Sequence, residues 1–166
     1  SLLKDIDKYR TNDFLGNPPL HYFEGLGKIS SGTLYFLSIL SRILNNFDDL
    51  KIYKICEIGS GYGGQAKIIL DYGVNHYTCI DDFRTLGLAK KYLDFFKYPN
   101  VEFKTTKEID DCSYDLVISN WCLSEFDDEG IDFYLNTIIK NSKNAYFEMN
   151  MEDYSRKYNL INKIKN

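Results

Sequence analysis

The sequence predicts an α/β fold in which helices cover both faces of a Rossmann-like, doubly wound, mostly parallel sheet. Short apolar runs alternate with segments of helical periodicity along most of the 166 residues. A cluster of glycines separates the apolar run at 54–58 from the helical pattern that follows it. A later run, 114–119, is mostly apolar, which is typical of a strand buried on both faces. Right-handed crossovers would join such strands into one sheet.

The individual elements follow from periodicity and from turn residues. Residues 1–28 show no sustained periodicity, and two prolines mark a turn at 16–19. A helix is predicted over 33–47, where leucines recur at helical spacing. The predicted strands are 54–58, 77–80, 101–104, 114–119 and 144–149, and the predicted further helices are 63–72, 85–96, 128–140 and 153–165.

Length and composition favour one globular domain, with 44% hydrophobic and 16% aromatic residues. We interpret residues 1–166 as a single domain, in which 1–48 cover the ligand site and 49–166 form the sheet. The net charge of −4 and the lack of a dense Lys/Arg block argue against nucleic acid as a partner. Four scattered cysteines, no signal peptide and no apolar run of membrane-spanning length lead us to expect a cytoplasmic protein without a membrane span.

The glycine cluster after the first strand predicts a site where a ligand meets bare backbone. Gly59 permits a tight turn, Gly61 lets a ligand approach the main chain, and Gly63 and Gly64 allow helix and strand to pack closely. The helix N-terminus that follows offers unpaired N–H groups and a partial positive charge. Glu57, two residues before the first glycine, would face the ligand with a negative charge.

Two ligand classes fit the glycine spacing. The pattern Gly59-x-Gly61-x-x-Gly64 matches the dinucleotide fingerprint, which indicates an NAD-dependent oxidoreductase as one alternative. Glu57 would repel a pyrophosphate but attract a sulfonium or an amino group. Asp81 and Asp82 follow the second strand, about 20 residues downstream, where a carboxylate can bind ribose hydroxyls.

Glu57, the glycine loop and Asp81 together resemble the first two motifs of class I S-adenosylmethionine-dependent methyltransferases. The stretches Asp-Leu-Val-Ile-Ser-Asn-x-x-x-Ser-Glu and Tyr-Phe-Glu-Met-Asn are more specifically similar to sugar O-methyltransferases, and the similarity covers about residues 14–151. The resemblance implies methyl transfer from S-adenosyl-L-methionine to a sugar hydroxyl of a glycan or nucleotide-sugar, with S-adenosyl-L-homocysteine as product. The antiparallel hairpin that usually ends this fold has no counterpart here. The chain is therefore trimmed, completed by another chain, or one part of a longer polypeptide.

Ligands of such sheets bind outside the carboxyl ends of the strands, which selects the candidate binding residues. The candidates for cofactor binding are Glu57, Gly59, Ser60, Gly61, Tyr62, Gly63, Asp81, Asp82, Thr105, Thr106, Ser119 and Asn120. The candidates for acceptor binding are Tyr22, Trp121, Ser124 and Asn150. Trp121 could stack on a sugar, stack on adenine or fill the core, and Tyr62 could close over the cofactor or simply pack.

A sugar hydroxyl needs a general base, and two residues are candidates. His21 lies in an N-terminal segment that could fold over the pocket, and Glu125 follows the fourth strand. Glu125, Asp127 and Asp128, with Asp82, could hold a divalent cation, but such clusters are more often solvated or cap helices, so no metal is predicted. A domain that keeps this fold without catalysis is a further alternative, and the sequence predicts no oligomeric state.

Overall fold

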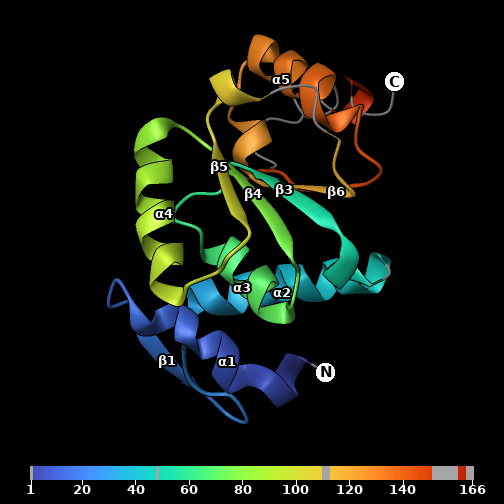
Figure 1. The fold of residues 1–166 in the computed structure, drawn as a ribbon. Coiled ribbons are helices and arrows are strands. Elements are labelled where there is room, and N and C mark those ends of the chain that lie inside the picture. The colour runs from blue at the N-terminus through green and yellow to red at the C-terminus, as the bar shows by residue number, and fades with distance from the viewer. Residues whose placement is uncertain (1, 48, 110–112, 151–160, 164–166) are drawn as a thin grey trace.

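The computed structural model describes residues 2–47, 49–109, 113–150 and 161–163. Its helices and strands run in an alternating order that continues to β7 (Figure 1). The helices are α1 (Ile6–Arg10), α2 (Ser31–Asn46), α3 (Gly64–Tyr72), α4 (Phe83–Phe96) and α5 (Asp128–Tyr134). The strands are β1 (Leu20–Phe23), β2 (Gly27–Ser30), β3 (Lys54–Ile58), β4 (His76–Ile80), β5 (Val101–Lys104), β6 (Leu116–Asn120) and β7 (Ala145–Glu148).

Five parallel strands form the main sheet, in the order β5-β4-β3-β6-β7. The chain winds outward from β3 to β4 and β5, then returns to the other side of β3 with β6 and β7. The strand order therefore reverses between β3 and β6, and ligands of open α/β sheets bind at this switch point. This topology confirms the predicted fold class, and all five strands fall where the sequence predicts them to within two residues.

Apolar side chains on the two faces of the sheet form separate cores. Ile55 and Ile118 pack on one face with residues of α2, α3 and α4. Cys56 and Val117, one residue away on the same strands, pack on the other face with α5 and the π-helical turn Leu135–Ile139. This alternation explains why the strand sequences are apolar almost throughout, since neither face of the sheet is open to solvent.

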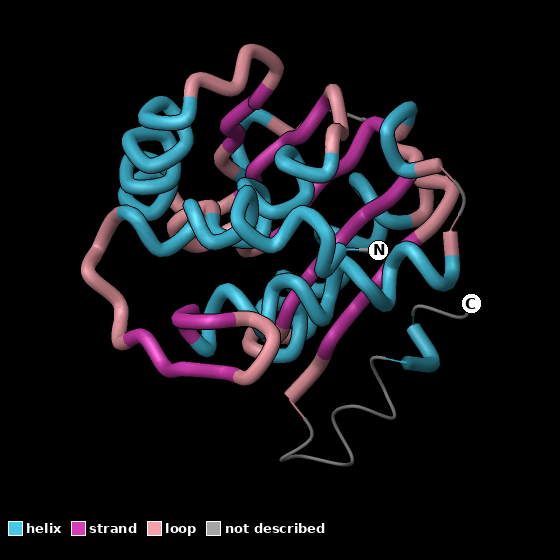
Figure 2. The backbone as a smooth tube through the Cα atoms, turned by 90° about the horizontal axis from the view of Figure 1, so that it is seen from below, coloured by secondary structure: helices cyan, strands magenta, loops and turns pink. Residues whose placement is uncertain are grey.

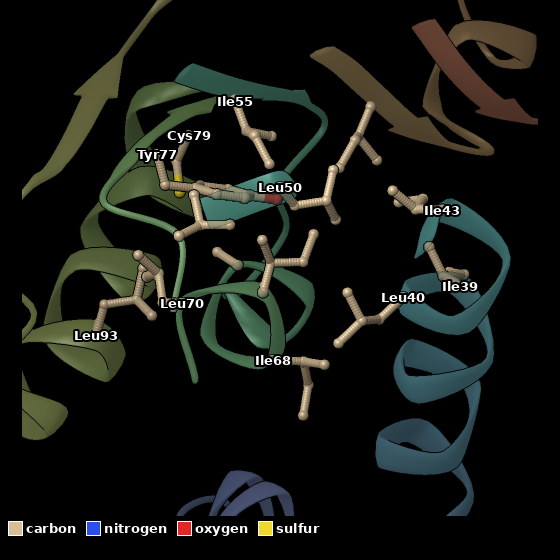
Figure 3. Close-up of a cluster of buried hydrophobic side chains, with 14 of the residues drawn as sticks. Ile39, Leu40, Ile43, Leu50, Ile55, Ile68, Leu70, Tyr77, Cys79 and Leu93 are labelled. Carbon is tan, nitrogen blue, oxygen red and sulfur yellow. The ribbon is translucent and has the colours of Figure 1, made fainter. Parts of the chain in front are cut away.

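The predicted amphipathic N-terminal helix is α2, and it supplies much of the first core. Its side chains Ile39, Leu40 and Ile43 are completely buried. Figure 3 shows them directed toward Ile55 of β3 and Ile68 of α3. Helix α2 therefore packs along α3, the helix that follows the glycine loop, and so fixes the position of that loop.

The N-terminal segment contains structure that the sequence does not predict. Strands β1 and β2 form an antiparallel hairpin that stands apart from the main sheet (Figure 2). All four residues of β1 are exposed, so the strand has no buried face and produces no alternating apolar pattern. Burial of Lys67 on α3, beside Asp71 and the hydroxyl of Thr11, ties the segment before the hairpin to the sheet domain.

Three helix boundaries differ from the prediction for local reasons. Helix α4 begins two residues early, because the Asp82 carboxylate accepts hydrogen bonds from the N–H groups of Arg84 and Thr85. The predicted helix 128–140 is α5 followed by a π turn. The predicted helix 153–165 lies mostly outside the described residues, of which 161–163 are helical. No helix in the described part of the chain is long and apolar enough to cross a membrane.

The packing of α2 leads to a stability prediction. Leu40→Ala removes a fully buried side chain and should lower the free energy of unfolding by about 2–5 kcal/mol. Leu88→Ala on α4 is the matched control, because Leu88 is 57% exposed, and it should change that free energy by less than about 0.5 kcal/mol. Urea denaturation followed by circular dichroism measures both values. Equal losses would contradict the placement of α2 in the core.

Candidate cofactor site

The loop between β3 and α3 turns sharply and leaves open space above its second glycine. Gly59 has a φ of +79°, and a Cβ added there would lie 2.3 Å from the Cβ of Cys122. Only glycine fits at that contact. Gly61 has a φ of +55°, and a Cβ added there would meet nothing within 4 Å. The backbone at Gly61 is therefore accessible to a ligand, as the sequence predicts.

The other two glycines serve packing, with partners that differ from the expected strand. Gly63, with a φ of +92°, lies against Tyr92 and Leu93 of α4. A Cβ at Gly64 would lie 2.4 Å from the hydroxyl of Tyr62 and 2.5 Å from Phe36 of α2. The expected close approach of helix and strand is therefore wrong for Gly64, whose small size admits α2 and the neighbouring tyrosine.

Glu57 is buried at the carboxyl end of β3, beneath this loop. Its side chain accepts a hydrogen bond from the hydroxyl of Tyr77, at 2.8 Å. Burial raises the pKa of Glu57 to about 8, the bond from Tyr77 opposes the rise, and the nearby charge of Asp81 adds to it. A cation bound above the loop would favour the ionised form of this carboxylate.

Asp81 follows β4 and is half-buried beside the glycine loop. Its Oδ2 accepts the N–H of Gly61 at 2.9 Å, and its Oδ1 accepts the N–H of Asp82 at 2.8 Å. Burial raises the pKa of Asp81, while these two N–H groups oppose the rise. Asp82 instead caps α4, and its hydrogen bonds with Thr85 lower its pKa. The two adjacent carboxylates thus have different structural roles, one toward the loop and one toward the helix.

A cavity of about 780 Å³ opens at the carboxyl ends of the strands. Its volume lies within the range of about 300–1,000 Å³ that is usual for ligand pockets. Four carboxylates and a single lysine are among its described lining residues, so it suits a neutral or cationic ligand better than a pyrophosphate. The lining residues are Gly59, Asp81, Asp82, Phe83, Thr105, Thr106, Lys107, Glu108, Cys122, Glu125, Phe126 and Tyr134.

Several predicted cofactor residues lie around this cavity. Thr105 and Thr106 line it, and Thr105 also forms a capping box with Glu108 in the turn after β5. Ser60 is buried, with its hydroxyl beside the thiol of Cys79. Ser119 is completely buried, and its hydroxyl has no hydrogen-bond partner among the described residues. Ser119 therefore lies behind the site rather than at its surface.

Buried polar atoms without partners gather near Glu57. Both amide atoms of Asn120 are buried and lack regular partners in the described part of the chain, and the amide lies close to the Glu57 carboxylate. The Oε1 atom of Gln65, in the first turn of α3, is also buried and unpaired. Unpaired buried groups are costly, and they are usually explained by an absent ligand or water. Gln65 was missed by sequence reasoning, although its place in the first helical turn after the glycines is a usable signal.

Tyr62 does not line the cavity at the strand ends. Its ring packs edge-on against Tyr92 of α4, with centroids 5.1 Å apart, and against Phe36 of α2. It borders a second cavity of about 480 Å³, next to the turn at Pro18 and Pro19. Of the two alternatives for Tyr62, its contacts therefore favour packing between the glycine loop and the N-terminal segment.

The two candidate bases lie in different parts of the molecule. His21 and Tyr22 are exposed on β1, and Figure 1 shows this strand beside α1, away from α5. Glu125 lies on the loop before α5 and lines the cavity, although its side chain is exposed. Ser124 donates its hydroxyl to the carbonyl of Trp121 and accepts the N–H of Asn150 at 3.2 Å. The structure thus joins Ser124, Asn150 and Trp121 but does not bring His21 to Glu125.

Trp121 lies immediately after β6, and its side chain is 51% exposed. Its ring stacks on Tyr35 of α2, with centroids 5.1 Å apart, so the exposure rules out the core-filling alternative. The carboxylates Asp127 and Asp128 lie at the start of α5, where Asp127 accepts the N–H of Gly130 as the N-cap. Across the described residues, no three His, Cys, Asp or Glu side chains are arranged to hold a metal ion.

Comparison with solved structures identifies the architecture. Among similar structures, a Thermoplasma acidophilum protein, 1320, is 17% identical with a TM-score of 0.65, and the match covers 98% of this chain and 77% of that one. A candidate sarcosine dimethylglycine methyltransferase from Galdieria sulphuraria is 20% identical with a TM-score of 0.63, covering 96% and 67%. The methyltransferase domain of bacterial CtHen1-C is 13% identical with a TM-score of 0.56, covering 68% and 63%.

This chain has the class I methyltransferase fold. The identities are low, so the likeness concerns the fold alone, and the chain spans 63% of the length of the CtHen1-C domain. No protein-family model and no curated protein matches the sequence. In the methyltransferase fold observed here, Glu57, Gly61 and Asp81 meet at the switch point of the sheet.

The burial of Glu57 predicts a pH-dependent stability. An unfolded glutamate has a pKa of about 4.3, so between about pH 4 and pH 8 the folded protein retains a proton that the unfolded chain has released. Stability is then lost as the pH rises through this range. Glu57→Gln removes the titration and should stabilise the protein at pH 8 by on the order of 1–3 kcal/mol, with a smaller gain at pH 5.

Urea denaturation at both pH values tests this expectation. Glu102→Gln on β5 is the matched control, because the Glu102 side chain is 57% exposed and its replacement should have little effect at either pH. A Glu57→Gln variant that is less stable than the wild type at pH 8 would contradict the account of Glu57 as a carboxylate buried without a cation.

Proposed function

We propose that this chain is an S-adenosylmethionine-dependent methyltransferase that acts on a sugar hydroxyl. The observation that carries the proposal is the buried Glu57 beneath a glycine loop whose Gly61 is open to a ligand. The ammonium and sulfonium groups of S-adenosylmethionine are cations, which a desolvated carboxylate attracts more strongly than it would in water. Asp81, oriented by two N–H groups, leaves lone pairs that could accept ribose hydroxyls.

The acidic lining of the cavity weighs against the oxidoreductase alternative. Asp81, Asp82, Glu108 and Glu125 surround a space in which a pyrophosphate would add two more negative charges. S-adenosylmethionine contains no phosphate. The same cavity also supports a domain that only binds the cofactor, so catalysis requires a test of its own.

The proposed reaction is an in-line displacement at the methyl group. The acceptor oxygen attacks the methyl carbon while the carbon–sulfur bond breaks, and its electron pair passes to sulfur to give neutral S-adenosylhomocysteine. The acceptor proton passes to a base. The protein contributes mainly by aligning the acceptor oxygen with the methyl group, and a base within hydrogen-bond reach adds a factor of about 10²–10⁴. Trp121, Ser124 and Asn150 would bind the acceptor, with Tyr22 added if the hairpin approaches.

Cofactor identity can be tested by thermal unfolding. S-adenosylhomocysteine at 100 times its Kd should stabilise the wild type by about 2.7 kcal/mol, which raises the Tm by about 5–10 °C, whereas NAD should not. Asp81→Asn should lose most of this rise. Asp94→Asn, which changes an exposed aspartate on α4, should keep it. Protection by NAD and not by S-adenosylhomocysteine would establish the oxidoreductase alternative instead.

The base can be tested by substituting each candidate separately. Transfer of labelled methyl to a panel of sugars and nucleotide-sugars is measured at saturating S-adenosylmethionine for Glu125→Gln and His21→Asn. Loss of the base should lower kcat by about 10²–10⁴-fold. Glu129→Gln, an exposed position on α5, serves as the control. Full turnover in both variants would remove both candidates, and absence of transfer in the wild type would favour the non-catalytic alternative.

A further inference from the structure

The backbone at Trp121 adopts a conformation that large side chains avoid. Its φ is +67°, in the left-handed region, where a bulky residue is a genuine outlier. Two hydrogen bonds hold it there, because the Trp121 N–H donates to the Glu148 carbonyl at 2.7 Å and its carbonyl accepts the N–H of Ser124 at 3.0 Å. Such strain is kept where the surrounding structure requires it, often at ligand sites.

This conformation leaves one side of the indole ring covered and a large part of it exposed. Tyr35 of α2 covers the ring at an interplanar angle of 32°. Half of the side chain remains exposed, which is unusual for a tryptophan, since burial of its large apolar surface is favourable. The exposed part is therefore available to a flat ligand.

Glu148, at the end of β7, holds both the backbone and the stacking partner of Trp121. Its carbonyl accepts the Trp121 N–H, and its Oε2 accepts the hydroxyl of Tyr35 at 2.8 Å. Its Oε1 accepts the hydroxyl of Tyr146 at 2.6 Å and pairs with Arg42. The Glu148 side chain is only 16% exposed, so these charge-assisted hydrogen bonds are shielded from water.

The ring lies at the edge of the candidate cofactor site. Asn120, the preceding residue, places its unpaired amide near Glu57. Cys122, the following residue, packs against Gly59 and lines the cavity. A ligand stacked on Trp121 would thus lie between the glycine loop and solvent, where an acceptor could approach a methyl group held above Gly61.

We propose that Glu148 and Tyr35 are positioning residues that hold Trp121 as a platform for the sugar ring of the acceptor. This inference rests on the proposed function, and it adds residues that the sequence motifs do not contain. The face of a pyranose carries C–H groups that pack against the π face of an indole, and a fixed platform avoids the entropic cost of ordering the ring on binding. Tyr35 and Glu148 are 113 residues apart in sequence, so only the fold brings them together.

The fluorescence of Trp121 reports directly on the platform, because the chain has only one tryptophan. In protein saturated with S-adenosylhomocysteine, Tyr35→Ala and Glu148→Ala should raise acrylamide quenching of Trp121 and lower its anisotropy. Tyr35→Phe keeps the ring but loses the hydrogen bond to Glu148, and should show a smaller change in the same direction. Arg42→Gln is the control, because the Arg42 side chain is 56% exposed and does not contact Trp121, and it should match the wild type.

Sugar binding gives the second measurement. UDP-glucose, UDP-galactose, GDP-mannose and their methyl glycosides are titrated into the wild-type complex with S-adenosylhomocysteine. At least one methyl glycoside should change the Trp121 emission, and Tyr35→Ala should weaken that sugar's binding about tenfold, with affinity for S-adenosylhomocysteine unchanged. Unchanged cofactor affinity also shows that the variant is folded, and Tyr35→Phe provides the same comparison with less disturbance of packing.

Three results would overturn the inference. Trp121 emission that responds to S-adenosylhomocysteine but to no sugar in the panel would assign the ring to adenine. Sugar binding that is equally strong in Tyr35→Ala and the wild type would remove the positioning role. Quenching unchanged in Tyr35→Ala and Glu148→Ala would show that neither residue holds the ring. In each case retained binding of S-adenosylhomocysteine leaves the proposed cofactor intact, whereas its loss in the wild type would refute the proposed function itself.

Discussion

The burial of the Glu57 carboxylate, with no cation among its described neighbours, is the constraint around which this site is arranged. An isolated charge is expensive to bury, and the protein lowers that cost by retaining the proton and by accepting the Tyr77 hydroxyl. The unpaired amide of Asn120 adds a second unsatisfied group beside it. A cationic ligand would satisfy both, so the site is less stable empty than occupied, as expected where function conflicts with stability.

Much of the fold could be predicted because burial on both faces leaves a strong signal in the sequence. Strands β3 and β6 are apolar almost throughout, and the glycines between β3 and α3 mark a turn that few other residues allow. The positions of Glu57 and Asp81 follow from the rule that strand ends carry the ligand site. Their hydrogen bonds could not be predicted, since the Gly61 N–H that orients Asp81 depends on the exact path of the loop.

Other features could not be predicted because they depend on contacts between distant segments. The hairpin of β1 and β2 has no buried face on its first strand, so it has no periodicity to detect. Tyr62 is adjacent to the glycines in sequence, yet its contacts with Phe36 and Tyr92 direct it away from the cavity at the strand ends. The link from Glu148 through Tyr35 to Trp121 joins β7, α2 and the loop after β6, and local sequence carries no trace of it.

Calorimetry of S-adenosylmethionine binding at pH 7, in phosphate and in Tris, tests the central claim most directly. Because Glu57 holds a proton in the empty protein and a cation favours its ionised form, binding should release about one proton, and the measured heat should differ between the two buffers. Glu57→Gln should bind more weakly and release no proton from this position. Absence of binding heat in both buffers, or binding by Glu57→Gln that equals the wild type in affinity and proton release, would contradict the account.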